Sequence, residues 1–154
     1  MEHESVTKMW TNYLESIGES PESTDKKYIA WHFCDNEQDA NELAELVLEG
    51  TKRATASLYL SYGEDEELPK FGDLSIIIDW DGFARCIIKT TNVEILPYKD
   101  VTEEFAATEG EGDKSLGYWR RCHWDYFSRE MQEIGKTPSE DMVVVCEKFE
   151  VVYK

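Results

Sequence analysis

The stretch EFAATEGEGDKSLGYW, residues 104–119, is the most distinctive part of the sequence. Its centre, residues 109–113, packs three carboxylates and two glycines into five positions between two segments that we expect to be helical. Glycine adopts positive φ readily and lets another backbone come close, so this loop can fold tightly against a neighbour. The loop is either a solvated turn, in which Asp113 and Ser115 cap the next helix, or a site at which the carboxylates converge. The carboxylates are Glu109, Glu111 and Asp113.

Three like charges this close repel and raise one another's pKa unless a cation or a hydrogen-bond donor lies among them. The basic residues that we expect to supply this counter-charge are Lys52, Arg53, Arg120 and Arg121. The alternation of acidic residues is too short for a calcium-binding loop and lacks its distal Glu. We therefore expect no metal and no cofactor.

Hydrophobic spacing and turn residues predict the elements around this loop. Helices are expected at residues 4–18, from Asp35 or Asn36 to about 48, from Asp100 to about 107, and from Ser115 to about 134. Strands are expected at residues 26–33, 74–80, 83–98 and 142–153, with a hairpin turn at Asp81-Gly82. This mixed order predicts an α+β fold whose sheet curls into a small barrel.

Length and composition predict one domain, residues 1–154, with the N-terminal helix as an extension. We find no run of about eighteen apolar residues and no signal-peptide core, so we expect a cytoplasmic protein without a membrane span. The cysteines are widely spaced and form no CxxC pair, which predicts free buried thiols rather than zinc ligands or disulfides. They are Cys34, Cys86, Cys122 and Cys146.

Sixteen Lys and Arg residues against 33 Asp and Glu residues give a formal charge of −17. Binding to many phosphates needs a basic face, so we expect no long nucleic acid as a partner. A nucleoside, a nucleotide or a short RNA can still bind in a local pocket that contains one or two lysines.

A second short pattern, GTKRAT at residues 50–55, follows the helix that is expected to end near residue 48. A glycine just past a helix end leaves the next backbone NH groups free. Lys52 offers three donors and a charge, and Thr55 offers a donor and an acceptor, so both can bind one polar ligand. The alternative interpretation is a helix cap followed by a solvated basic strand.

Aromatic residues accompany His123 on the apolar face of the helix expected at residues 115–134. His123 either makes a structural hydrogen bond or contributes to a site, and His32 in the first strand has the same two interpretations. The Trp and Tyr residues are mostly expected in the core, and one of them, such as Trp119, can stack on a base.

Taken together, these residues resemble the ASCH domain family of the PUA-like superfamily. The resemblance rests on GTKRAT after a helix, GD before a strand, the central hairpin, and the block DVT-EEFA-ATEGEGD-SL-YW-RCH-YF, and it extends from about Tyr28 to Tyr153. It implies a PUA-like small mixed β-barrel with flanking helices and a cleft beside the GxKxxT element. The chain is longer than the small amidohydrolase branch of that family, has an extra N-terminal helix and carries a more acidic loop.

Members of the family are described as RNA-binding proteins, as ribonucleases and, in one branch, as amidohydrolases that deacetylate N4-acetylcytidine. In that branch a Lys and a Thr of GxKxxT act with a Glu just after the short helix, and Lys52, Thr55 and Glu109 match these positions. The resemblance implies that the glycine loop folds against GTKRAT so that Glu109 meets Lys52. The residues expected to bind substrate are Gly50, Arg53, Glu111, Asp113, Trp119 and His123.

Two assignments of the protons stay open. Lys52 is either a neutral base, which requires a protonated Glu109, or a charged group that stabilises an oxyanion while Glu109 is the base. Thr55 either attacks the acyl carbonyl or positions a water there. The alternatives to an enzyme are a nucleotide-binding or RNA-binding module without chemistry and a protein-interaction domain.

Overall fold

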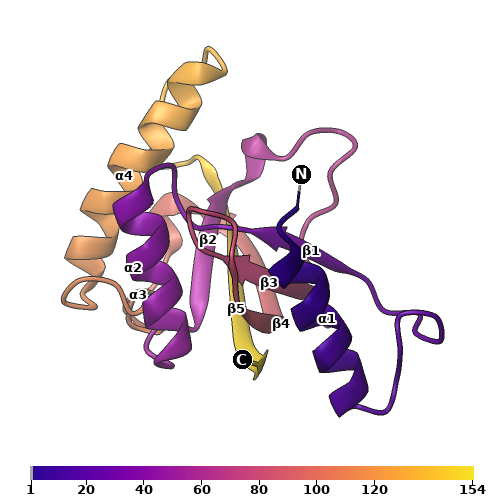
Figure 1. Cartoon of the computed structure of the whole chain (residues 1–154). Helices are drawn as coiled ribbons and strands as arrows, with labels where there is room; N and C mark the ends of the chain where they lie inside the picture. Colours follow the sequence, from indigo (N-terminus) through magenta and orange to yellow (C-terminus); the bar gives the residue numbers. More distant parts are fainter. Residues whose placement is uncertain (1) are drawn as a thin grey trace.

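Residues 2–154 are described by the computed structural model, which has four α-helices and a five-stranded sheet (Figure 1). The elements in chain order are α1 (Glu4–Ser16), β1 (Tyr28–Trp31), α2 (Glu37–Leu48), β2 (Ala54–Leu58), β3 (Leu74–Ile78), β4 (Ala84–Pro97), α3 (Glu103–Glu109), α4 (Leu116–Glu133) and β5 (Val143–Tyr153). Two short 3₁₀ turns, η1 (Tyr59–Ser61) and η2 (Tyr98–Asp100), join them. The predicted α+β class is confirmed.

The helix ends follow from local capping residues. Asn36 accepts a hydrogen bond from Asp39 N and begins α2, and Ser115 accepts one from Tyr118 N and begins α4. The helix expected from Asp100 begins later, because η2 turns the chain first and Thr102 then caps α3 through Phe105 N. Helix α3 also ends later than predicted, so Glu109 is its last residue rather than a residue that follows it.

The sheet has the strand order β1-β3-β4-β5-β2. Strand β1 runs parallel to β3, and the other three pairs are antiparallel. The long strand β4 forms the centre with β5, and its pairing shifts register between Thr90 and Asn92. Such a bulge bends the strand and re-aims the side chains beside it.

The sheet is open in the part of the chain that the structure describes, so the predicted barrel is not confirmed. Its two edges are the short strands β1 and β2, which lie at opposite ends of the strand order and do not pair. Residues 29–31 of β1 and residues 55–57 of β2 instead line the two sides of one cleft. The place where a barrel would close is therefore occupied by this cleft.

Helices cover both faces of the sheet (Figure 1). Helix α1 packs on Ile76 and Ile87, whereas α2 packs on the neighbouring residues Ile77 and Ile88. Successive residues of a strand point to opposite faces, so α1 and α2 lie on opposite sides of β3 and β4. Helices α3 and α4 pack against β2 and β5 through a third apolar cluster, which contains Phe127.

None of the helices in residues 2–154 combines the length and the apolar character that a membrane span requires. All four cysteines are free thiols. Cys86 and Cys146 are buried as predicted and Cys34 is half-buried, but Cys122 of α4 is exposed and lines the cleft.

We expect Leu14→Ala to lower the free energy of unfolding by about 2–5 kcal/mol, because Leu14 is completely buried between α1 and the sheet. Ile17→Ala, at the end of the same helix, removes a side chain that is 42% exposed and should cost much less. Urea denaturation of both variants measures the difference. Equal losses would contradict the packing of α1 on the sheet.

Candidate functional site

A cleft of about 670 Å³ lies between the open edges of the sheet and the helices α2 and α4. Strands β1 and β2 supply its sides, and α4 contributes Tyr118, Cys122, His123 and Tyr126. Its lining is acidic: nine carboxylate side chains face it, against Lys52 and Arg129. The nine are Asp39, Glu42, Glu67, Asp73, Glu109, Glu111, Asp125, Glu130 and Glu147.

The glycine loop folds against the GTKRAT segment, as the sequence predicts. Gly110 has φ 71°, and a Cβ at this position would lie 2.2 Å from the carbonyl oxygen of Thr51. Only glycine allows this approach. The contact is reinforced by Arg53 N, which donates a 2.9 Å hydrogen bond to the carbonyl of Thr108. The end of α3 is thereby held beside the start of β2, and Glu109 faces Lys52.

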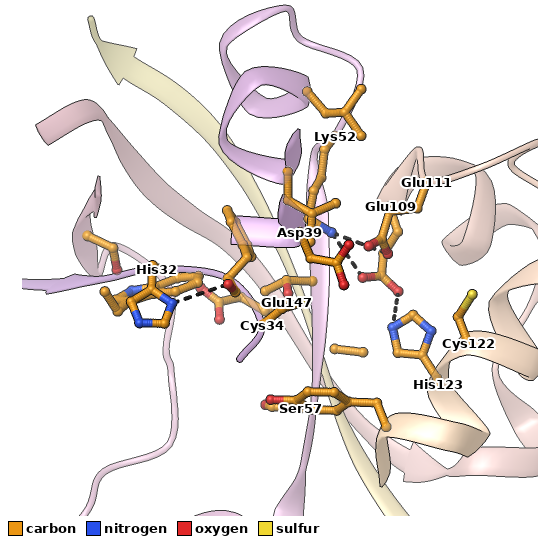
Figure 2. Close-up of a pocket in the computed structure, with 18 of the residues that line it drawn as sticks. His32, Cys34, Asp39, Lys52, Ser57, Glu109, Glu111, Cys122, His123 and Glu147 are labelled. Atoms are coloured by element: carbon orange, nitrogen blue, oxygen red, sulfur yellow. Dashed lines mark hydrogen bonds and ion pairs between the residues drawn. The ribbon is translucent and has the colours of Figure 1, made fainter. Parts of the chain in front are cut away.

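Lys52 and Glu109 form a buried ion pair at the inner wall of the cleft (Figure 2). Each residue is 1% exposed. Lys52 Nζ donates to Glu109 Oε1 at 3.1 Å and to the carbonyl of Ala54 at 2.8 Å. Glu111 Oε2 lies 3.6 Å from the same Nζ, which is an ion-pair distance rather than a hydrogen bond.

The second oxygen of Glu109 is held from α4. Trp119 Nε1 donates to Glu109 Oε2, and His123 Nε2 lies 3.2 Å from the same oxygen. His123 Nδ1 lies 2.9 Å from the carbonyl of Trp119, and the two rings stack with centroids 4.1 Å apart. Both carboxylate oxygens of Glu109 therefore have partners inside the protein.

The charges of these groups follow from this geometry. Burial alone would raise the pKa of Glu109, but His123 and Lys52 outweigh it and hold the pKa at about 2. Burial would lower the pKa of Lys52, yet Glu109 and Glu111 raise it above its ordinary value. Glu109 likewise raises the pKa of His123 against the effect of burial. The wall of the cleft thus holds a carboxylate, an ammonium and an imidazole that favours its charged form.

Glu111 differs from Glu109, although only Gly110 separates them. Its side chain is 20% exposed and lines the cleft. Burial and the negative charge of Glu109 raise the pKa of Glu111, and the charge of Lys52 only partly opposes this. Glu111 is therefore the carboxyl of this group that can exchange a proton with a ligand.

The structure brings together five of the predicted site residues. Lys52, Thr55, Glu109, Glu111 and His123 all line the cleft. The remaining four do not line it: Gly50, Arg53, Asp113 and Trp119.

Each of these four has a structural part. Gly50 has φ 82° and ends α2, and Arg53 is exposed while its backbone links α3 to β5. Asp113 accepts from Ser115 N at 2.9 Å, so it caps the start of α4 and does not join the other carboxylates. Trp119 is 2% exposed and acts on the cleft through its hydrogen bond to Glu109.

Sequence reasoning missed three polar residues on the strands. Ser75, Thr90 and Glu147 are each less than 10% exposed, and all three line the cleft. They come from β3, β4 and β5. The available signal was a charged residue within the apolar run VVVCEKF, since a glutamate inside a buried strand needs a partner or a ligand.

The group Glu109, Glu111 and His123 has ligand atoms within 4.8 Å of one another, a spacing that can hold a metal ion. In this protein Lys52 Nζ already lies between the two carboxylates, and Trp119 Nε1 donates to Glu109. Ammonium and indole NH groups therefore take the positions that a cation would need.

Comparisons with known proteins show the family of the chain. The ASCH domain model matches residues 29–153. The chain belongs to the ASCH domain family. An ASCH domain structure from Lactobacillus crispatus JV V101 is 42% identical, with a TM-score of 0.91, and the match covers 99% of this chain and 97% of that one. A structure from Enterococcus faecalis V583 is 36% identical, with a TM-score of 0.84, and covers 97% and 88% of the two chains. No curated protein matches this ASCH chain.

We expect opposite effects on stability from Glu109→Gln and Glu111→Gln at pH 7. The first removes the hydrogen-bonded counter-charge of buried Lys52, leaves only Glu111 at 3.6 Å to balance it, and should cost about 3–5 kcal/mol. The second removes a charge that burial and Glu109 disfavour, and should stabilise the protein by about 0.5–2 kcal/mol. Thermal and urea unfolding of both variants measure these changes.

The pH dependence of the two effects also differs. Wild-type Glu109 has a folded pKa of about 2 against an ordinary 4.5, so its contribution is complete above 4.5 and is lost as the pH falls towards 2. Glu111 has a raised folded pKa, so the gain from Glu111→Gln appears only as the pH rises above 4.5. A stability gain from Glu111→Gln that is unchanged at pH 3.5 would contradict this assignment.

Gly110→Ala should separate α3 from the GTKRAT segment, because its Cβ would meet the Thr51 carbonyl. Gly135→Ala is the matched control, with a similar φ of 73° but nothing within 4 Å of the added Cβ. The control should lose about 1–2 kcal/mol from the left-handed backbone alone. Gly110→Ala should lose more, and an NMR titration should show the pKa of His123 falling towards its ordinary value. An unchanged His123 pKa would contradict the proposed coupling.

Proposed function

We propose that this ASCH protein hydrolyses the acyl group of N4-acylated cytidines in the cleft beside Lys52. The observation that carries the proposal is that Lys52, Thr55 and a carboxyl with a raised pKa, Glu111, line one cavity of nucleoside size. These are the parts that amide hydrolysis needs: a positive charge for the developing oxyanion, a group that orients the nucleophile, and a proton carrier.

Lys52 is proposed to be the electrostatic group rather than the base. Its raised pKa and its pairing with Glu109 keep the ammonium charged. Two of its three N–H donors are used by Ala54 and Glu109, and within residues 2–154 the acceptor nearest to the third is Glu111, at 3.6 Å. The acyl oxygen of a substrate would accept from this third donor, and the interaction would strengthen as negative charge develops on that oxygen.

Glu111 is proposed to be the base and the later acid. Glu109 is a poor candidate because its pKa is about 2 and both its oxygens are already engaged. Glu111 is accessible from the cleft, and its raised pKa lies closer to the working pH, which suits proton transfer in both directions.

Thr55 is proposed to orient a water molecule. Among residues 2–154 no side chain hydrogen-bonds to its hydroxyl, so no base stands ready to activate Thr55 itself. The water oxygen would add to the acyl carbon while Glu111 takes a water proton. The tetrahedral intermediate would then break its C–N bond, and Glu111 would return the proton to the leaving N4 amine. The products are cytidine and a carboxylic acid.

The acidity of the cleft supports a neutral nucleoside over a nucleotide or RNA. Lys52, His123 and Arg129 face the nine carboxylates of the lining, and Lys52 and His123 are both already paired with Glu109. A phosphate at this wall would be repelled, whereas an uncharged base with N–H donors meets acceptors.

A binding module without chemistry is the second candidate, and one observation favours it. The Lys52–Glu109 pair is buried and internally satisfied, as structural ion pairs are. In that case the cleft would bind a nucleoside and release it unchanged.

Incubation of the wild type with N4-acetylcytidine, followed by chromatography, should show cytidine. Thr55→Val and Glu111→Gln should each lower kcat by about 10²-fold or more, since each removes a positioned proton or water contact. Glu111→Gln is the sharper variant because it is also expected to be more stable than the wild type. Lys148→Gln, a change outside the cleft lining on β5, is the control.

Three results are decisive. Cytidine release that Glu111→Gln abolishes supports the amidohydrolase. Release that persists in Glu111→Gln would reject Glu111 as the proton carrier. No release from any N4-acylcytidine, with cytidine still bound, would replace the enzyme by the binding module.

A further inference from the structure

A second polar group lies on the sheet side of the same cleft and has no part in the proposed reaction. Glu147 is 8% exposed and Thr90 is 1% exposed. Thr90 Oγ1 donates a 2.6 Å hydrogen bond to Glu147 Oε2. Thr90 is the one hydrogen-bond partner of the Glu147 carboxyl in residues 2–154, and Glu147 lines the cavity. A buried carboxyl with a single partner is costly unless a ligand completes its hydrogen bonds.

Glu147 lies beside Thr55, one of the residues of the proposed reaction. In the antiparallel ladder of β2 and β5, Glu147 is the direct partner of Thr55. Directly opposed residues point to the same face of the sheet with their Cβ atoms about 4.5–5.5 Å apart. Strand order then places Thr90 on β4, one strand beyond Glu147 and farther from Lys52. A ligand whose acyl group reaches Lys52 past Thr55 would therefore lay its ring over Glu147.

The environment of Glu147 favours its uncharged form. Burial raises the pKa of Glu147, Thr90 opposes this through its hydrogen bond, and the charge of Asp73 adds to the rise. No basic side chain forms an ion pair with Glu147 in the described part of the chain. A protonated carboxyl presents one O–H donor beside one carbonyl acceptor.

We propose that Glu147, held by Thr90, binds the edge of a heteroaromatic ring that presents an acceptor nitrogen next to an exocyclic N–H. This inference rests on the proposed function and names the part of the substrate that the cleft recognises. Cytosine and its N4-acyl derivatives have this edge, in N3 and the N4–H. The Glu147 hydroxyl donates to N3 and its carbonyl accepts from N4–H, so one side chain pairs with a ring nitrogen and with the exocyclic amine. Because Thr90 donates to Oε2, Oε2 is the carbonyl oxygen that also accepts from N4–H, and Oε1 carries the hydroxyl proton.

The test is equilibrium binding of cytidine and 3-deazacytidine by calorimetry, which requires no catalysis. The deaza compound replaces N3 by a carbon and cannot accept the hydrogen bond. The wild type should bind cytidine about tenfold more tightly than 3-deazacytidine, the loss expected for one unpaired buried donor. Glu147→Gln keeps one donor and one acceptor and should keep the preference, whereas Glu147→Leu should bind both compounds equally weakly. Glu150→Gln, at an exposed position of the same strand, is the control and should match the wild type.

The outcomes separate this inference from the proposed reaction. Equal affinity of the wild type for the two compounds, or no binding of cytidine, overturns the role of Glu147 whether or not hydrolysis occurs. A wild-type preference that Glu147→Leu removes and Glu147→Gln retains supports it, even if no acyl group is hydrolysed. Because the first comparison uses only the wild type, it remains decisive if Glu147→Leu fails to fold.

Discussion

The buried ion pair between Lys52 and Glu109 is the interaction on which the arrangement of the cleft depends. Two charges removed from water are stable only with good geometry and with partners for their remaining hydrogen-bonding atoms. Here Ala54, Trp119 and His123 supply those partners from β2 and α4. The need to neutralise the buried Glu109 carboxylate therefore holds α3, α4 and the start of β2 in one arrangement, although β2 is far from the two helices in the chain.

The neutralisation of Glu109 also explains why its pKa is lowered while the pKa of Glu111 is raised. Glu109 is the last residue of α3, where the helix dipole disfavours a negative charge, so its ionised form depends on Lys52 and His123. Gly110 then turns the chain away through positive φ, and Glu111 reaches the cleft without donors of its own. One carboxylate stabilises the fold, and its charge raises the proton affinity of the other. Functional sites commonly arise where neighbouring titratable groups are separated in this way.

Part of the arrangement of the cleft residues could be predicted from the sequence, and the rest could not, for physical reasons. The resemblance of GTKRAT and of the glycine loop to the ASCH family implied the meeting of Lys52 and Glu109, whereas the residues alone left a solvated loop open as the alternative. Without that resemblance, the counter-charge could have come from any of four basic residues, because one step along an extended chain reverses the direction of a side chain. They are Lys52, Arg53, Arg120 and Arg121. Trp119 has the apolar spacing of a core residue, and its single N–H gives no periodic signal. Glu147 was missed because its strand pattern is dominated by the apolar residues around it.

The barrel expectation fails for a reason that bears on function. Closing the sheet would require β1 and β2 to pair, yet both are short, with four and five residues, and both line the cleft. An open edge exposes backbone donors and acceptors, and proteins usually cover or shorten such edges. In this protein the cover comes from the side chains of α2 and α4, which leave a cavity where strand pairing would fill the space. Polar groups from β2, β4 and β5 line this cavity together with Lys52 and Glu111. The unpaired edges are thus the structural condition for the cleft in which we propose that a small molecule binds.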